Sequence, residues 1–413
     1  MEQNTQRRVV VTGLGVIAPN GIGKQAFWHA TSNGISGIQR FQRFPTADLP
    51  IQVGGEVPAF AVEQYLEHKL ADRTDRMTHF ALVAVQEALK DAGIEMARED
   101  PHRVGTVIAN TFGGTEYALE QVTNLHVRGP RSMSAFTAIA WLPIASVGQV
   151  SIRYNMQGYS KVSVNDTVGG LDALGLAYTA IQRGAAEVIV AGGSEALLQP
   201  YMLLVLSHSG SCATGDDPRA YRPFDRRAAG FLLAEGAGMC VLEEYEHARR
   251  RSASIYGEVV GYGQTNDPHG LKKPSASTKQ YTRAFSFALR EAPLQPREIA
   301  YVSLDGRALP AFDAAEAEVL HAVFGSETEH IPVSVPRTML GHSFAAAGTL
   351  DAIAALLALK HGIIPPTINC EEFDPRYRLD LVRNEARTQA RSAALIAGRS
   401  LMGVNVVLAL KKI

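Results

Sequence analysis

The sequence of 413 residues has little of several features that would define its class at once. Its three cysteines, which stand far apart, form neither a disulfide framework nor a metal cluster: Cys212, Cys240 and Cys370. No uncharged apolar run reaches the roughly 18 residues of a membrane span, and the polar N-terminus has no signal-peptide core. The net charge of −1 gives no electrostatic reason to bind nucleic acid or an anionic membrane. We therefore expect a cytoplasmic protein without nucleic-acid or membrane partners and without a metal.

No linker rich in Pro, Ser or Gly divides the chain, and 46% of its residues are hydrophobic. Short apolar runs typical of buried strands alternate with helical patterns. The predicted strands are 9–11, 104–109, 162–164, 187–191, 256–262, 301–304, 333–335, 395–397 and 404–410, and the predicted helices include 74–92, 168–183 and 345–359. Such alternation indicates parallel or mixed sheets covered on both faces. The plan occurs twice, so we predict a duplicated α/β/α/β/α fold with halves 1–250 and 251–413 in one compact unit.

Six segments in a fixed order carry a family resemblance. They are RRVVVTGLGVIAPNG (7–21), YRPFDRRAAGFLLAEGAGMCVLEE (221–244), the spacing of Pro310, Asp313 and Glu316, MLGHSFAAAG (339–348), IIPPTIN (363–369) and GVNVVLAL (403–410). Together they resemble the β-ketoacyl-ACP synthases of the thiolase superfamily over essentially the full chain. The resemblance implies a thiolase-like version of the duplicated fold.

Two further segments resemble one branch of that family. SVNDTVGGLDALGLA (163–177) is similar to the chain-length factors, the ketosynthase-like subunits of type II polyketide synthases, whose Gly-Gly-Leu-Asp-Ala run appears here as Gly169–Ala173. DGRALPAFDAAEAEVL (305–320) resembles the same branch. The branch usually has glutamine at the nucleophile position, whereas this chain has Thr167.

The resemblance implies a degenerate active site. Thr167 stands in place of the nucleophilic cysteine and Asp305 in place of the first histidine, while His342 matches the retained second histidine. Arg337 falls where active relatives commonly carry lysine, and Leu401 replaces a gating phenylalanine in a loop that has lost its glycines. Condensation needs a thiolate and two imidazoles, so we expect this chain not to condense.

The residues themselves leave alternatives open. Thr167 is either a nucleophile activated by His342, or Asp166 or Thr167 caps the helix that begins near residue 168. His342 is either a donor to a thioester oxygen or a structural histidine. A carboxylate at Asp305 can only accept hydrogen bonds where an oxyanion needs a donor, and Arg337 can pair with it instead.

A second set of residues concerns product length. In the chain-length factors, a helix after a Gly-Gly pair closes the tunnel that holds the growing polyketide, and the matching positions here are Thr115, Ala118 and Val122. They share one helical face, and Tyr201 matches a further lining position. The alternative is a close-packed helix face. These small residues predict a roomier tunnel unless other side chains refill it: Phe112, Tyr117, Phe136 or Trp141.

The sequence therefore predicts a non-condensing, ketosynthase-like chain-length factor for malonyl-derived type II polyketide biosynthesis. The resemblance implies a heterodimer with an active ketosynthase, and an acyl carrier protein whose phosphopantetheine is the substrate arm; no cofactor of its own is expected. One alternative is an enzyme, either a malonyl-ACP decarboxylase or a Thr-dependent acyltransferase. The other is a silent scaffold or chaperone subunit.

Overall fold

The computed structural model describes residues 7–268, 278–292 and 294–413. Their strands form one mixed sheet, because the first strand of each half pairs with the other. The first half contributes, in spatial order, β6 (Ser160–Ser163), β5 (Val104–Ala109), β7 (Val188–Glu195), β8 (Gly236–Glu244) and β1 (Val9–Ala18), with β2 (Gly21–Ile22) beside β1. The second half continues with β9 (Gly257–Asn266), β16 (Val404–Lys411), β15 (Ala393–Arg399), β10 (Ile299–Ser303), β11 (Pro332–Ser334) and β13 (Asp380–Leu381).

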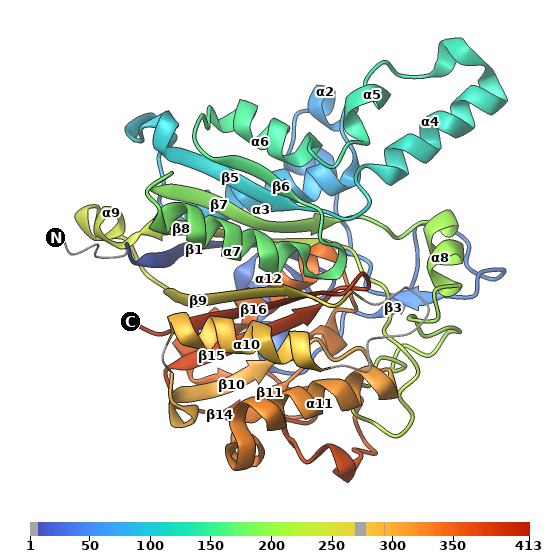
Figure 1. Cartoon of the computed structure of the whole chain (residues 1–413). Helices are drawn as coiled ribbons and strands as arrows, with labels where there is room; N and C mark the ends of the chain where they lie inside the picture. The colour runs from blue at the N-terminus through green and yellow to red at the C-terminus, as the bar shows by residue number, and fades with distance from the viewer. Residues whose placement is uncertain (1–6, 269–277, 293) are drawn as a thin grey trace.

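Helices cover both faces of each half-sheet, which gives the five layers (Figure 1). The outer layer of the first half holds α3 (Arg76–Ala92) and α6 (Ala145–Tyr154), and that of the second half holds α10 (Lys279–Glu291) and α11 (Pro310–Phe324). The central layer consists of α7 (Gly169–Gln182) and α12 (Ala345–His361). The predicted thiolase-like α/β fold is confirmed.

The central helices show why the sequence needs Gly-Gly at the start of α7. A Cβ atom on Gly170 would lie 2.2 Å from the carbonyl oxygen of Ala345, so only glycine permits this approach to α12. Residues Ala345–Leu359 of α12 are all buried, as their uniformly apolar pattern predicts. Burial on all sides fixes the two helices that begin just after Thr167 and His342.

Most predicted elements agree with the structure within a few residues, but the strand predicted over 9–11 continues to Ala18 because it pairs with β8 along that length. The helix expected over 74–92 begins one residue after Asp75, whose side chain accepts from Met77 N, and it ends at Gly93, which has a left-handed φ of 66°. The remaining short helices and strands are α1 (Lys24–Ser32), α2 (His68–Ala71), α9 (Tyr245–Arg250), β3 (Gln39–Arg40), β4 (Val53–Gly54), β12 (Ile363–Ile364) and β14 (Arg387–Thr388).

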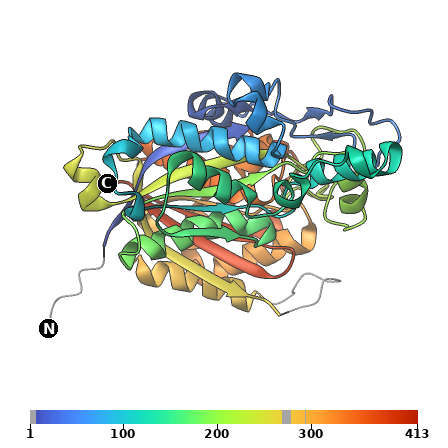
Figure 2. The same cartoon turned by 90° about the horizontal axis from the view of Figure 1, so that it is seen from above.

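Two segments project from the layered body on the side opposite the termini (Figures 1 and 2). The first contains α4 (Thr115–Arg128) and α5 (Thr137–Ala140), and the second is α8 (Pro200–Ser207). Among the described residues, no helix combines the length and apolar character needed to cross a membrane.

Candidate functional site

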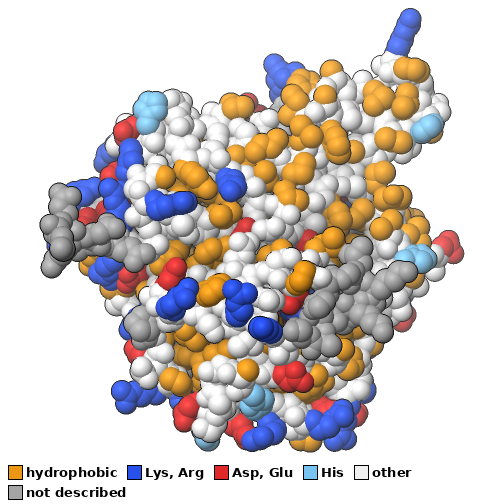
Figure 3. Space-filling view, viewed as in Figure 1, with side chains coloured by type: hydrophobic (Ala, Val, Ile, Leu, Met, Phe, Trp, Pro, Cys, Tyr) orange, Lys and Arg blue, Asp and Glu red, His pale blue; other side chains and the backbone are white. Residues whose placement is uncertain are grey.

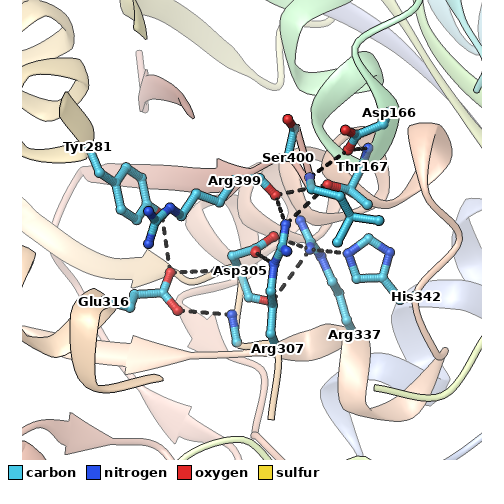
Figure 4. A network of polar contacts seen from close by, with 12 residues as sticks. Asp166, Thr167, Tyr281, Asp305, Arg307, Glu316, Arg337, His342, Arg399 and Ser400 are labelled. Atoms are coloured by element: carbon cyan, nitrogen blue, oxygen red, sulfur yellow. Dashed lines mark hydrogen bonds and ion pairs between the residues drawn. The ribbon is translucent and has the colours of Figure 1, made fainter. Parts of the chain in front are cut away.

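Asp305 lies at the centre of a buried network of ion pairs (Figure 4). It follows β10, and its two carboxylate oxygens accept from two guanidinium groups: Oδ2 from Arg307 Nε at 2.8 Å and Oδ1 from Arg337 Nη1 at 2.7 Å. Burial alone would raise the pKa of Asp305, but the two guanidinium groups outweigh it and hold that pKa well below its usual value. The predicted pairing of Arg337 with Asp305 is confirmed.

Arg337 has a second acidic partner. It lies in a 3-10 turn (Pro336–Met339), and its Nε donates to Oδ2 of Asp351 on α12 at 2.6 Å. Burial raises the pKa of Asp351 to about 6, against the opposing effect of the Arg337 charge. The guanidinium is thus enclosed by two carboxylates, which compensate its desolvation. A side chain held in this way is a structural cation rather than a mobile acid or base.

Thr167 has no base. It is fully buried in the short turn before α7, and its hydroxyl donates to the carbonyl oxygen of Arg399 at 2.8 Å. Its other side-chain contact is with Nη2 of Arg307, at 3.4 Å. A peptide carbonyl cannot remove a proton from an alcohol, and no hydrogen bond joins Thr167 to His342 in the described chain. This geometry opposes the Thr-dependent acyltransferase alternative.

The predicted cap of α7 is wrong. Neither Asp166 nor Thr167 accepts from a first-turn N–H of this helix. Asp166 has a left-handed φ of 37°, and its carboxylate accepts from the backbone N–H of Thr167, of Leu401 at 3.1 Å and of Met402 at 3.2 Å. The capping preference loses because two amides of the loop between β15 and β16, together with the amide of Thr167, offer three donors to one carboxylate. Asp166 therefore anchors the loop that carries Leu401.

His342 has both ring nitrogens facing donors. Phe344 N lies 3.2 Å from Nδ1, and Nη1 of Arg337 lies 3.1 Å from Nε2. A neutral imidazole has one nitrogen that can accept a hydrogen bond. Protonation of the ring would leave neither nitrogen able to accept from these two donors. Burial, followed by the Arg337 charge, lowers the pKa of His342 well below its usual value. Neither nitrogen is placed to donate to a thioester oxygen, which opposes the malonyl-ACP decarboxylase alternative and favours the structural one.

Glu316 and Asp313 on α11 explain the spacing that the family keeps. Glu316 accepts from the backbone N–H of Asp305 at 2.8 Å and of Gly306 at 2.9 Å, and also from Tyr281 Oη at 3.1 Å. Asp313 accepts from the backbone N–H of Phe224 at 2.8 Å. The two carboxylates hold the loop after β10 in shape even though its histidine is missing.

Asp172, the aspartate of the Gly-Gly-Leu-Asp-Ala run, has a structural role. Its buried carboxylate accepts four hydrogen bonds from three different elements, and their donors are Ser163 Oγ (2.7 Å), Asn165 Nδ2 (2.7 Å), Tyr262 Oη (2.5 Å) and Gln264 Nε2 (2.8 Å). Tyr262 and Gln264 lie on β9, so this carboxylate ties α7 to both half-sheets. A buried carboxylate is stable only where its oxygens accept hydrogen bonds in this way.

The candidate tunnel residues lie on the outer face of α4. Tyr117 and Gln121 are the buried residues of this helix, whereas Val122 is 45% exposed and Thr115 and Ala118 are partly exposed. The face is therefore not close-packed within the chain at Val122. Tyr201 on α8 is 56% exposed on the same side of the molecule (Figures 1 and 2).

The aromatic residues near α4 divide into two groups. Phe112 packs on Phe344 with ring centroids 5.2 Å apart, and Tyr117 Oη donates to Ser134 Oγ at 2.9 Å. Phe136 and Trp141 are 37% and 49% exposed. Of these four aromatic side chains, only Phe136 and Trp141 therefore face outward beside the α4 face. Leu401 is partly buried and packs against the apolar cluster that contains Phe344.

Sequence reasoning missed Arg307. Its signal was a single charged residue beside Asp305 in an otherwise apolar segment, where a buried charge requires a partner.

Cys212 is no nucleophile, since burial raises the pKa of its thiol to about 12. Within the described ranges, no group of His, Cys, Asp and Glu side chains is arranged to hold a metal ion.

Comparisons with known proteins identify the family of the chain. The family models for the N-terminal and C-terminal domains of β-ketoacyl synthase match residues 6–248 and 256–371. The tetracenomycin polyketide synthase ketoacyl synthase beta subunit of Streptomyces glaucescens is 39% identical over 407 residues, which cover 98% of each chain.

Two solved structures have similar folds. The ishigamide ketosynthase/chain length factor superposes with a TM-score of 0.91 at 29% identity and covers 99% of this chain and 100% of its own. A type II polyketide synthase acyl-carrier protein in complex with its ketosynthase, bound to the hexaketide, includes a chain with a TM-score of 0.90 at 28% identity, covering 99% of this chain and 100% of its own. The chain therefore belongs to the β-ketoacyl synthase family, in the branch of the ketosynthase beta subunits, or chain-length factors, of type II polyketide synthases.

Proposed function

We propose that this chain is the non-condensing subunit of a heterodimeric ketosynthase and sets polyketide chain length by shaping the product tunnel. The observation that carries the proposal is an exposed apolar surface beside a catalytic site without a nucleophile. We call this surface the apolar patch; its members are 43–56% exposed and comprise Val122, Ile139, Trp141, Ile144, Tyr201, Leu204 and Val205. Apolar side chains gather over α4, α5 and α8 in the space-filling view (Figure 3). Clusters of this kind mark interaction sites.

The proposed occupant of the apolar patch is an active ketosynthase. A subunit without a thiolate and with a blocked histidine has a role in condensation only beside a subunit that retains both. The similarity to a ketosynthase/chain length factor supports this pairing, and the similarity to a ketosynthase in complex with its acyl-carrier protein supports a carrier as the second partner. The carrier's phosphopantetheine arm would deliver malonyl-derived units to the active subunit.

The outward face of α4 is the proposed end of the tunnel. Thr115, Ala118 and Val122 follow one another along this face. The inward face is held by Tyr117, whose Oη donates to Ser134 Oγ at 2.9 Å, and by Gln121, whose Oε1 accepts from Ser134 N at 2.8 Å. A helix held on its inner side presents its outer face rigidly, which suits a surface that must stop a growing chain at a defined length. Tyr201 would contribute from α8.

The pairing can be tested through the apolar patch. We expect native mass spectrometry of this chain co-expressed with its ketosynthase to show a one-to-one complex. Ile139→Asp should weaken that complex by about tenfold or more, because it places a charge in a desolvated interface. Ile35→Asp is the matched control, since Ile35 is similarly exposed (47% against 54%) but follows α1. A stable homodimer that ignores the ketosynthase would contradict the proposal and favour the scaffold alternative.

A further inference from the structure

Arg307 occupies the space in front of the residue at the nucleophile position. Arg307 and Arg337 are the two largest fully buried side chains in the described part of the chain, and Arg307 is 1% exposed. Its guanidinium contacts Asp305, the hydroxyl of Thr167 and the carbonyl oxygen of Arg399, to which Nη2 donates. The group also lies 4.7 Å from the ring centre of Phe312. The hydroxyl of Thr167 is therefore covered by a cation that is held on several sides (Figure 4).

The backbone of this loop turns the side chain inward. Gly306 and Ala308, on either side of Arg307, have left-handed φ values of 52° and 55°. A Cβ atom on Gly306 would lie 2.5 Å from Val335, so the position requires glycine. Ala308 adopts a conformation that is strained for an alanine. Such strain persists only where surrounding contacts fix the loop, and those contacts include the Glu316 bonds described above.

We propose that Arg307 is a plug that seals this subunit's own vestigial acyl site, so that a carrier-borne acyl chain enters only the site of the partner ketosynthase. The entry of the acyl chain into the partner's site rests on the proposed function, whereas the seal formed by Arg307 concerns this chain alone. Arg307 is a positioning residue in this scheme: it touches no substrate and acts by denying space.

The plug and the loss of the catalytic histidine are physically coupled. A guanidinium can be buried only beside a compensating charge, and Asp305 supplies it. An imidazole in that place would face two guanidinium groups without an anion between them. The substitution at 305 that removes an oxyanion donor therefore also provides the anchor for the plug. This coupling explains why an acidic residue, rather than any non-catalytic residue, suits position 305 in this chain.

A cysteine reporter tests the seal. In the full chain, Thr167→Cys places a thiol at the nucleophile position, and we measure its alkylation by iodoacetamide with peptide mass spectrometry. We expect alkylation at least about 100-fold slower than in Ile35→Cys, an exposed reference, because reactivity requires access. Adding Arg307→Ala should accelerate labelling at position 167 by about tenfold or more. Adding Arg307→Met, which keeps most of the bulk without the charge, should leave it slow.

The direction of the expected change separates access from electrostatics. Removing a guanidinium next to a thiol raises the thiol pKa and lowers the thiolate fraction, so loss of charge alone would slow alkylation. Acceleration in the alanine variant therefore reports an opened path. Fast labelling of Thr167→Cys with Arg307 intact, or equal labelling in the alanine and methionine variants, would overturn the proposal.

A natural cysteine controls for unfolding. Cys240 is fully buried on β8, whose sheet neighbours are β1 and β7, and its labelling should stay unchanged in the Arg307→Ala variant. If it accelerates in parallel with position 167, the opening is global and the plug is rejected. Native mass spectrometry of the same variants with the ketosynthase distinguishes the two proposals: a sealed site in a chain that forms no heterodimer leaves the plug intact and removes the proposed function.

Discussion

Replacing Asp305 with alanine is expected to lower the free energy of unfolding by about 3–5 kcal/mol, the usual cost of removing one partner from a buried ion pair. The variant leaves Arg307 without its only carboxylate partner among the described contacts, and Arg337 with Asp351 alone. Both guanidinium groups remain buried, and the desolvation of Arg307 is no longer compensated, while that of Arg337 is compensated by Asp351 alone. Urea denaturation followed by circular dichroism measures the change.

The control for this variant is an ion pair at the surface. Asp216 pairs with Arg40 at 3.5 Å, and their side chains are 72% and 52% exposed. Asp216→Ala should change the free energy of unfolding by less than about 1 kcal/mol. If the Asp305 variant behaves like this control, the network is not a source of stability and the anchor of the proposed plug is lost.

The pH dependence has a defined sign. The pKa of Asp305 is lower in the folded chain than its unfolded value, so its contribution is complete above the unfolded value near 4. The contribution is lost as the pH falls through the lower folded pKa. The part of the stability difference between the natural chain and the Asp305→Ala variant that comes from Asp305 itself should therefore shrink only in acid. Asp305 also helps to raise the pKa values of Asp351 (about 6) and Glu316 (about 7), so their ionisation costs the natural chain more than the variant, and the difference should also decrease as the pH rises through 6–7.

The same network opposes the conversion of this site to a condensing one by a single substitution. Thr167→Cys would place a thiol behind Arg307, and Asp305→His would remove the carboxylate of Arg307 and one of the two carboxylates of Arg337. The residues at 167, 305, 307 and 337 therefore depend on one another, which is a stronger condition than the absence of a thiol at position 167.

The sequence predicted the layered fold because strands and helices follow from local patterns. Strand and helix periods located most elements within a few residues, and the chemistry of Thr167 and Asp305 follows from their side chains alone. The pairing of Arg337 with Asp305 was predictable because a buried carboxylate needs a cation.

What the sequence could not supply depends on three-dimensional neighbours. The cap expected at α7 failed because Asp166 binds amides of a loop more than 200 residues away along the chain. The role of Arg307 depends on the left-handed loop that directs it toward Thr167, and no period or motif encodes that direction. The outward orientation of the α4 face likewise follows from the contacts of Tyr117 and Gln121 with Ser134 on the inner side of the helix.

Ala118→Phe is expected to shorten the polyketide made by the heterodimer by about one or more extension units, since a phenyl ring on the outer face of α4 fills the proposed tunnel end. The heterodimer should remain intact because Ala118 is only partly exposed and its helix is anchored from the other side. Thr123→Phe is the control: it adds the same ring to the same helix at an exposed position on a different face. Products are compared by liquid chromatography and mass spectrometry, and assembly by native mass spectrometry. An unchanged product distribution from an intact Ala118→Phe heterodimer would remove the tunnel assignment and leave a subunit whose contribution is confined to stabilising its partner.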